Sequence, residues 1–180
     1  MTGTRLRIVA MLAVLVSVGG TATAAHGSGD DDEGRTRARL IGYREVPAIS
    51  TDGRGTFRAR MVGDHAFRFR LRYGDLSSHV QQAHIHFGQK SVSGGISVFL
   101  CSNLGNGPAG TATCPQSGQV TGTITAAQVI GPEGQGISAG EFDELLRAIR
   151  AGVAYVNVHS DNFPAGEIRG QLRSGEHDHH

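Results

Sequence analysis

The stretch FRARMVGDHAFRFRLRY, residues 57–73, decides the fold class of this chain. On each side of the Gly63-Asp64 pair, apolar side chains take every second position and arginines take most positions between them. A period of two is typical of a β-strand with one buried face, and a Gly-Asp pair between two such runs is typical of a turn. The stretch therefore predicts an antiparallel hairpin.

The same spacing of strand-like runs and glycine-rich connections extends over most of the chain. We predict an all-β Greek-key β-sandwich or barrel of about eight antiparallel strands. Beyond the hairpin, the predicted strands are 39–46, 80–87, 95–101, 119–125, 152–159 and 166–173.

One segment, about 138–151, departs from this rhythm and predicts a short helix. Ser138 and Glu141 have the spacing of a capping box. Apolar residues then follow at i, i+3, i+4 and i+7 from Phe142, and Gly152 ends the pattern. We expect this stripe to pack into the core.

The first 24 residues have the features of a secretory signal peptide. Arg5 and Arg7 precede the apolar run 8–18, and Ala22-Thr23-Ala24 fits a cleavage site. We expect a flexible acidic linker over 25–37, the folded domain over 38–173 and a His-rich tail over 174–180. No further segment has the length of a membrane span, so the expected location is secreted or extracytoplasmic, in the periplasm or cell envelope.

Charge and cysteine content agree with export. Without Arg5 and Arg7 the basic count falls from 17 to 15 against 16 acidic residues, a net charge near −1, so no overall bias toward nucleic acid exists. Cys101 and Cys114 are an even pair, and in an oxidising compartment we expect them to form a disulfide.

Two histidines one residue apart raise the question of a metal site. In the strand 80–87, Ala83, Ile85 and Phe87 alternate with His84 and His86, so the histidines share the side away from the core. Two imidazoles at this spacing can lean toward one ion, but they also suit two unrelated solvent-facing residues.

A third histidine has the same character. In the strand 152–159, His159 shares the outward side with Tyr155 and Asn157. If this strand pairs with the His84 strand, three imidazoles converge on an exposed face with one position open. Neutral imidazoles suit copper, with zinc as the alternative metal.

Other side chains are candidates for supporting roles. Asp161, Asn162, Glu167 and Tyr155 could orient an imidazole from outside the ligand set, although ordinary turn and ion-pair roles fit them too. His79 has the opposite alternation and could serve as a ligand only across a bulge.

Five arginines share the outward face of the hairpin. Such a cluster could steer a small anion toward a nearby metal, face the acidic linker, or simply cover the sheet in solvent. No aromatic residue lies between them, which argues against nucleic acid. They are Arg58, Arg60, Arg68, Arg70 and Arg72.

Four segments together resemble the CHRD domain, a family first named from chordin and widespread in exported bacterial proteins. The resemblance covers about 38–173 and implies a compact extracytoplasmic β-sandwich with a poorly defined activity. The segments are ARLIGYREVPAIST, AHIHFG, GGISVFLC and GVAYVNVHSDNFPAGEIRGQL.

AHIHFG and VNVHSDN are also similar, more weakly, to the copper-ligand strands of copper/zinc superoxide dismutases. That similarity implies copper ligation by His84, His86 and His159. The stretch 88–120 contains no histidine, so the bridging histidine and the zinc ligands of that family are missing.

Two functions therefore remain open. The chain could bind a single copper ion for redox chemistry on superoxide or another small molecule. Alternatively, it could be a metal-free extracellular module that binds a protein, a polysaccharide or an anionic ligand through its loops or arginines.

Overall fold

The structure is a computed structural model that describes residues 1, 3 and 34–175. Apart from residues 1 and 3, the predicted signal peptide lies outside the described residues, as do residues 25–33 of the predicted linker and the tail histidines. The strands are β1 (Arg35–Ile41), β2 (Arg54–Met61), β3 (Phe67–Gly74), β4 (Val80–Phe87), β5 (Gly95–Ser102), β6 (Gly118–Ile124), β7 (Ala154–Ser160), β8 (Ile168–Gln171) and β9 (Arg173–Ser174).

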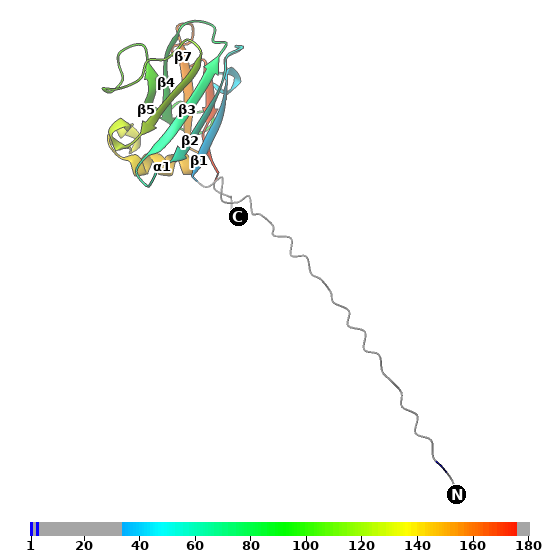
Figure 1. Ribbon diagram of the computed structural model, residues 1–180. Helices are drawn as coiled ribbons and strands as arrows, with labels where there is room; N and C mark the ends of the chain where they lie inside the picture. Colours follow the sequence, from blue (N-terminus) through cyan, green and yellow to red (C-terminus); the bar gives the residue numbers. More distant parts are fainter. Residues whose placement is uncertain (2, 4–33, 176–180) are drawn as a thin grey trace.

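These strands form a nearly closed antiparallel barrel, with α1 across one end (Figure 1). Their order around the sheet is β5-β4-β7-β8-β1-β2-β3-β6, with the short β9 beside β1. The connections β3 to β4 and β6 to β7 cross between distant parts of the sheet. The all-β prediction with about eight strands and one helix is confirmed.

The hairpin that suggested the fold is β2 and β3. Phe57 pairs with Leu71 and Arg58 with Arg70, so each apolar residue faces an apolar partner across the strands. Phe57 and Leu71 are almost completely buried, whereas the alternating arginines are exposed. His65 lies in the exposed connection between β2 and β3.

The first strand begins earlier than predicted. β1 starts at Arg35 and ends at Ile41, where a short 3-10 helix, η1 (Gly42–Arg44), turns the chain. The prediction of a strand over 39–46 was therefore several residues too late in the sequence. Residues 35–37, which were predicted to belong to the linker, are part of the sheet.

The helix begins later than predicted. α1 spans Phe142–Arg150, not 138–151, because Gly140 has a φ of +86°, which no helical residue adopts. The Ser138 amide still donates to the Glu141 carboxylate, but in a turn ahead of the helix. The apolar stripe is buried as expected, with Phe142 stacked on Phe67 and Leu145 fully enclosed.

Candidate metal centre

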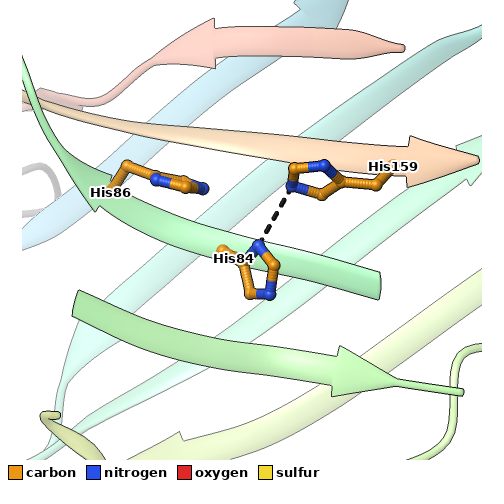
Figure 2. A group of neighbouring side chains, drawn as sticks. All are labelled: His84, His86 and His159. Carbon is orange, nitrogen blue, oxygen red and sulfur yellow. Dashed lines mark hydrogen bonds between the residues drawn. The ribbon is translucent and has the colours of Figure 1, made fainter. Parts of the chain in front are cut away.

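Three histidines come together where β4 and β7 pair. The two strands are antiparallel, with His84 opposite Asn157 and His86 opposite Tyr155. His159 lies two residues beyond Asn157, opposite Gln82, on the same side of the sheet. One ring nitrogen from each of the three histidines lies within 4.8 Å of the others, and the rings face a common point (Figure 2). The strand adjacency that the alternation could not establish is thus present.

The three rings are buried, which the sequence did not predict. His84, His86 and His159 are 0%, 7% and 5% exposed. They do lie on the side away from Ala83 and Ile85, as the alternation required, but that side is covered by other segments. The expectation of an exposed site with an open ligand position is therefore wrong, because the three rings are buried.

Several neighbours provide the cover. The Phe99 ring of β5 lies edge-on to His84, with 4.4 Å between the centroids. The segment 88–94 folds over the sheet and presents the Gly94 carbonyl to His86. The segment after β7 presents the Pro164 carbonyl to His159. In the β4–β5 pairing, one register shift lies directly before His84 and another directly before His86, and shifts of this kind change the direction of neighbouring side chains.

These two carbonyls fix the tautomers of two rings. The Nδ1–H of His86 donates to Gly94 O, and the Nδ1–H of His159 donates to Pro164 O, each at 2.9 Å. A carbonyl oxygen only accepts, so the Nε2 atom of each neutral ring is left with a lone pair. Backbone carbonyls that hold one imidazole nitrogen while the other faces a metal are a common feature of histidine metal sites.

The third ring presents its other nitrogen. His84 Nδ1 lies 3.0 Å from His159 Nε2, and in the metal-free protein it donates to that lone pair. His86 Nε2 and His84 Nε2 are buried and have no hydrogen-bond partner among the described residues. An unpartnered buried nitrogen is costly, and for His86 a bound cation would remove that cost.

Asn157 adds an oxygen that was not among the ligands predicted from the sequence. The Oδ1 atom of Asn157 lies 2.9 Å from His159 Nε2. Because the hydrogen bond to Pro164 O places the His159 proton on Nδ1, the lone pair of Nε2 faces a lone pair of this oxygen. A cation between the two atoms would turn this repulsion into attraction. Asn157 shares its side of β7 with His159, and this shared alternation was the signal that could have identified it.

The fit to a common ion is close but not complete. Two nitrogens bound to one ion at about 2.0–2.1 Å can be at most about 4.2 Å apart. The widest separation of 4.8 Å must therefore close by roughly 0.6 Å, which a small rotation of one ring can supply.

Burial keeps the three imidazoles neutral. Desolvation, followed by the charges of His159 and His86, lowers the pKa of His84 to about 2. Desolvation also lowers the pKa of His86 to about 4, against a raising hydrogen bond to Gly94. The pKa of His159 is lowered for the same reason. All three rings therefore keep a lone pair for a metal well below neutral pH.

Tyr155 packs directly against one of the histidines. Its ring stacks parallel to His86, with 4.8 Å between the centroids. The Arg169 guanidinium from β8 lies 3.4 Å from the centre of the same ring. Arg169 also donates to the carbonyls of Gln89 and Val92, which holds the covering segment over the site.

Glu45 is a buried carboxyl beside this group and was not among the residues predicted from the sequence. Burial raises its pKa to about 7, while the charge of Arg169 and a hydrogen bond from Asn157 act in the opposite direction. Through Asn157 it is connected to the histidines.

The remaining candidates for supporting roles do not contact the rings. Glu167 is fully buried and accepts hydrogen bonds from Thr51, Ser160 and the Ser77 amide. Asp161 is half exposed and pairs with His79 and Gln81. His79 is 87% exposed and is not a member of the three-histidine group. The backbone amide of Asn162 donates a hydrogen bond to the Ser78 hydroxyl, which ties the loop after β7 to the 77–78 turn.

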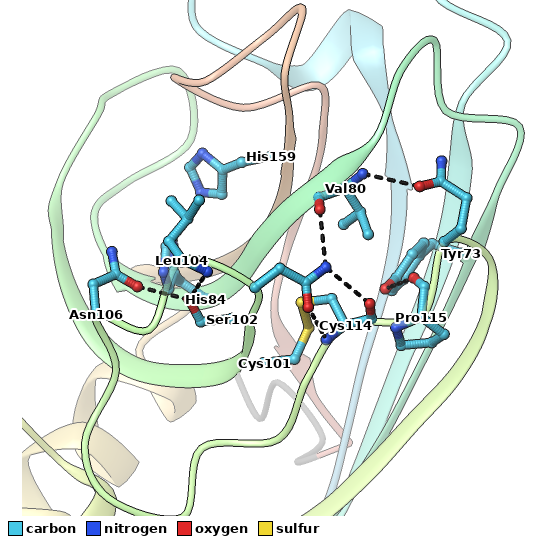
Figure 3. Close-up of a disulfide and its surroundings, with 12 residues drawn as sticks. Tyr73, Val80, His84, Cys101, Ser102, Leu104, Asn106, Cys114, Pro115 and His159 are labelled. Carbon is cyan, nitrogen blue, oxygen red and sulfur yellow. Dashed lines mark hydrogen bonds between the residues drawn. A yellow bond between two sulfur atoms is a disulfide. The ribbon is translucent and has the colours of Figure 1, made fainter.

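The predicted disulfide is present and lies near this site. Cys101 at the end of β5 is bonded to Cys114, which closes the loop 102–113 (Figure 3). Asn103 fastens the loop to β4 and to Cys114 through its side chain, which donates to the carbonyls of Val80 and Cys114. The disulfide therefore fixes a segment beside the histidine strand.

The hairpin arginines lie in the other half of the barrel. They project outward from β2 and β3, whereas the histidines lie on β4 and β7, and two further strands, β8 and β1, separate the pairs on one side of the sheet. Arg169 is the cation whose charge acts on His86.

The sequence was also compared with models of known protein families. The sequence model of the CHRD domain matches residues 36–172. The chain belongs to the CHRD domain family. No curated protein and no solved structure matches it. The match runs from the second residue of β1 to the end of β8 and includes all three histidines.

The CHRD domain and its disulfide are consistent with an extracellular protein. Within the described part of the chain, the one α-helix is too short and too polar to cross a membrane.

Proposed function

We propose that this CHRD domain is an exported protein that binds a single copper ion through His84 Nδ1, His86 Nε2 and His159 Nε2. The observation that supports this most strongly is the arrangement of His86 and His159. Both rings are held at Nδ1 by backbone carbonyls, which leaves both Nε2 atoms as lone pairs. The Oδ1 atom of Asn157 is a fourth donor within the group.

The donor set favours copper over other metals. Neutral imidazoles suit copper and zinc, and copper binds more tightly to a given set of nitrogen ligands. No cysteine thiolate is available, since Cys101 and Cys114 are joined to each other, so an electron-transfer centre of the blue-copper kind is not proposed. Zinc is the alternative metal.

We propose further that the site serves redox chemistry on a small molecule, with superoxide as the leading candidate. The overall reaction converts two superoxide ions and two protons to dioxygen and hydrogen peroxide. Bound copper would supply the one-electron chemistry. The HIH strand and the later histidine strand support this through their similarity to superoxide dismutases. Because the rings are at most 7% exposed, only a very small substrate fits this proposal.

The chain's own residues would act by holding the ligands. Gly94 and Pro164 orient two rings, Phe99 and Tyr155 limit their rotation, and burial keeps protons from competing for the nitrogens. Arg169 places a positive charge beside Tyr155, where it favours an anion over a cation as a small substrate.

A copper titration tests the site. The full chain with His177, His179 and His180 changed to alanine removes loose binding by the tail. Calorimetry with Cu(II) should show one ion per chain, and electron paramagnetic resonance should show several nitrogen ligands. In this background, His84→Ala, His86→Ala and His159→Ala should each weaken binding by at least about a hundredfold.

His79→Ala is the matched control, because His79 is exposed and outside the group. It should bind copper as the parent does. Circular dichroism and thermal unfolding of each metal-free variant separate loss of a ligand from loss of fold. Equal copper binding by all four variants would exclude the site and leave the domain as a metal-free module. If the protein prefers Zn(II) to Cu(II), zinc would replace copper as the proposed metal. If the copper-loaded protein is inactive on superoxide, only the dismutase proposal would be excluded.

A further inference from the structure

The outward face of β1, β2 and β3 carries a grid of arginines that the proposed metal site does not use. The strand register places Arg35, Arg60 and Arg68 in one row across the sheet. Arg37, Arg58 and Arg70 form the next row. We call these residues the arginine face; with the third row it consists of Arg35, Arg37, Arg39, Arg58, Arg60, Arg68, Arg70 and Arg72.

This arrangement works against folding stability. Like charges directly opposite each other on neighbouring strands are unfavourable. Arg58 and Arg70 are such a pair, and neither guanidinium has a hydrogen bond or ion pair among the described residues. Arg72 donates to Gln119, but no carboxylate of the described strands lies on this side. The grid therefore invites an anionic partner from outside.

The shape of the face suits an extended partner. A shallow open depression of about 750 Å³ lies over the first two rows. It is lined by Arg35, Arg58, Arg60, Arg68, Arg70 and Thr121, among others. Neighbouring strands are about 4.8 Å apart and alternate residues on a strand are about 6.5–7 Å apart. This face presents more cations, over a larger area, than one small anion can contact. A polymer chain with repeated negative groups could contact several of them at once.

The chemistry between the arginines narrows the kind of polymer. The outward residues of β6 that continue the rows are Gln119, Thr121 and Thr123. Their amide and hydroxyl groups can exchange hydrogen bonds with sugar hydroxyls. No aromatic ring lies among the arginines to stack on bases, and no large apolar side chain projects there to enter a membrane. Guanidinium groups bind carboxylates and sulfates in a bidentate manner.

We propose that the arginine face binds an acidic polysaccharide, a linear chain of sugars that carries carboxylate or sulfate groups. This binding is independent of the metal site, since the two lie in different halves of the barrel.

The test uses the full chain and two probes, polygalacturonate for carboxylates and heparin for sulfates. Calorimetry at 50 mM NaCl should show binding to at least one of them, weakening as salt rises. The double variant Arg58→Gln/Arg70→Gln should bind roughly tenfold more weakly, which corresponds to about 1.4 kcal/mol. The matched control Lys90→Gln/Arg147→Gln removes two exposed cations elsewhere and should bind as the parent does.

Thermal unfolding guards against a misfolded variant. Because Arg58→Gln/Arg70→Gln removes a like-charge pair, its melting temperature should equal or exceed that of the parent. The acidic run 30–33 precedes β1 in the sequence, so both probes are also titrated against a chain with these four residues changed to Asn and Gln. Absence of binding in both backgrounds, or equal binding by the two double variants, would overturn the proposal. Tighter binding of a mixed-sequence single-stranded DNA or of phosphatidylserine vesicles at the same salt concentration would also overturn the proposal. It would identify nucleic acid or an anionic membrane as the partner instead.

Discussion

A single glycine, Gly166, leaves the space in which the side chains of Glu45 and Asn157 meet. Gly166 has a φ of +130°, which side-chain-bearing residues rarely adopt. A Cβ added there would lie 2.5 Å from Glu45 Oε1 and 2.8 Å from Asn157 Nδ2. Gly166 therefore provides both the turn after β7 and the space for the Glu45–Asn157 pair.

At this scale we predict that Gly166→Ala destabilises the protein by at least about 2 kcal/mol, because it combines backbone strain with a clash. It should also weaken copper binding by displacing Asn157. Urea unfolding and a copper titration measure the two effects.

Gly110→Ala is the matched control, since Gly110 also has a positive φ of +84° but no atom within 4 Å of an added Cβ. It should lose less stability than Gly166→Ala and bind copper normally. Equal losses in the two variants would show that the contact with Asn157 is unimportant.

At the scale of elements, the loop 102–113 depends on its disulfide. Apart from the Cys101–Cys114 bond, the loop is attached by hydrogen bonds such as those of Asn103 and Asn106. Its residues are mostly exposed, and little apolar surface holds them in place. A closed loop of this size restricts the unfolded chain considerably.

We predict that Cys101→Ala/Cys114→Ala lowers the free energy of unfolding by about 3 kcal/mol. Urea unfolding of the variant beside the parent measures this. The parent with a reducing agent should approach the variant, whereas the variant should not respond to the reductant. A variant as stable as the oxidised parent would contradict the prediction.

For the whole molecule, buried titratable groups set the response to pH. The pKa of His84 falls to about 2 and that of His86 to about 4 in the folded protein, against 6.5 in the unfolded chain. Below pH 6.5 the unfolded chain thus binds more protons, and stability falls as the pH decreases. Glu45 acts oppositely, because a pKa raised to about 7 removes stability as the pH rises from 4.5 to 7.

Three histidines outweigh one carboxyl, so we predict that the metal-free protein loses on the order of 2–4 kcal/mol between pH 7 and pH 5. Urea unfolding at a series of pH values checks this. His79→Ala, which alters an exposed ring, should leave the profile unchanged. A flat profile for the parent would show that the three rings are not buried as neutral groups.

The sequence by itself determined the local features of this protein. The period-two alternation around Phe57 and Leu71 predicted the hairpin and its buried side, and the alternation in β4 and β7 predicted that His84, His86 and His159 lie on the side away from the core. These predictions succeed because the direction of a side chain in a strand depends only on its position in that strand.

Only the tertiary structure decided that the three histidines meet and that they are buried. Their meeting depends on the pairing of β7 with β4 across 66 intervening residues (88–153), and this pairing is set by the whole barrel. Their burial depends on the segments that contribute Gly94 and Pro164, which cover the outer side of the sheet. The arginine face and the histidines were likewise separable only once the strand order was known, because alternation within a strand contains no information about which strands become neighbours.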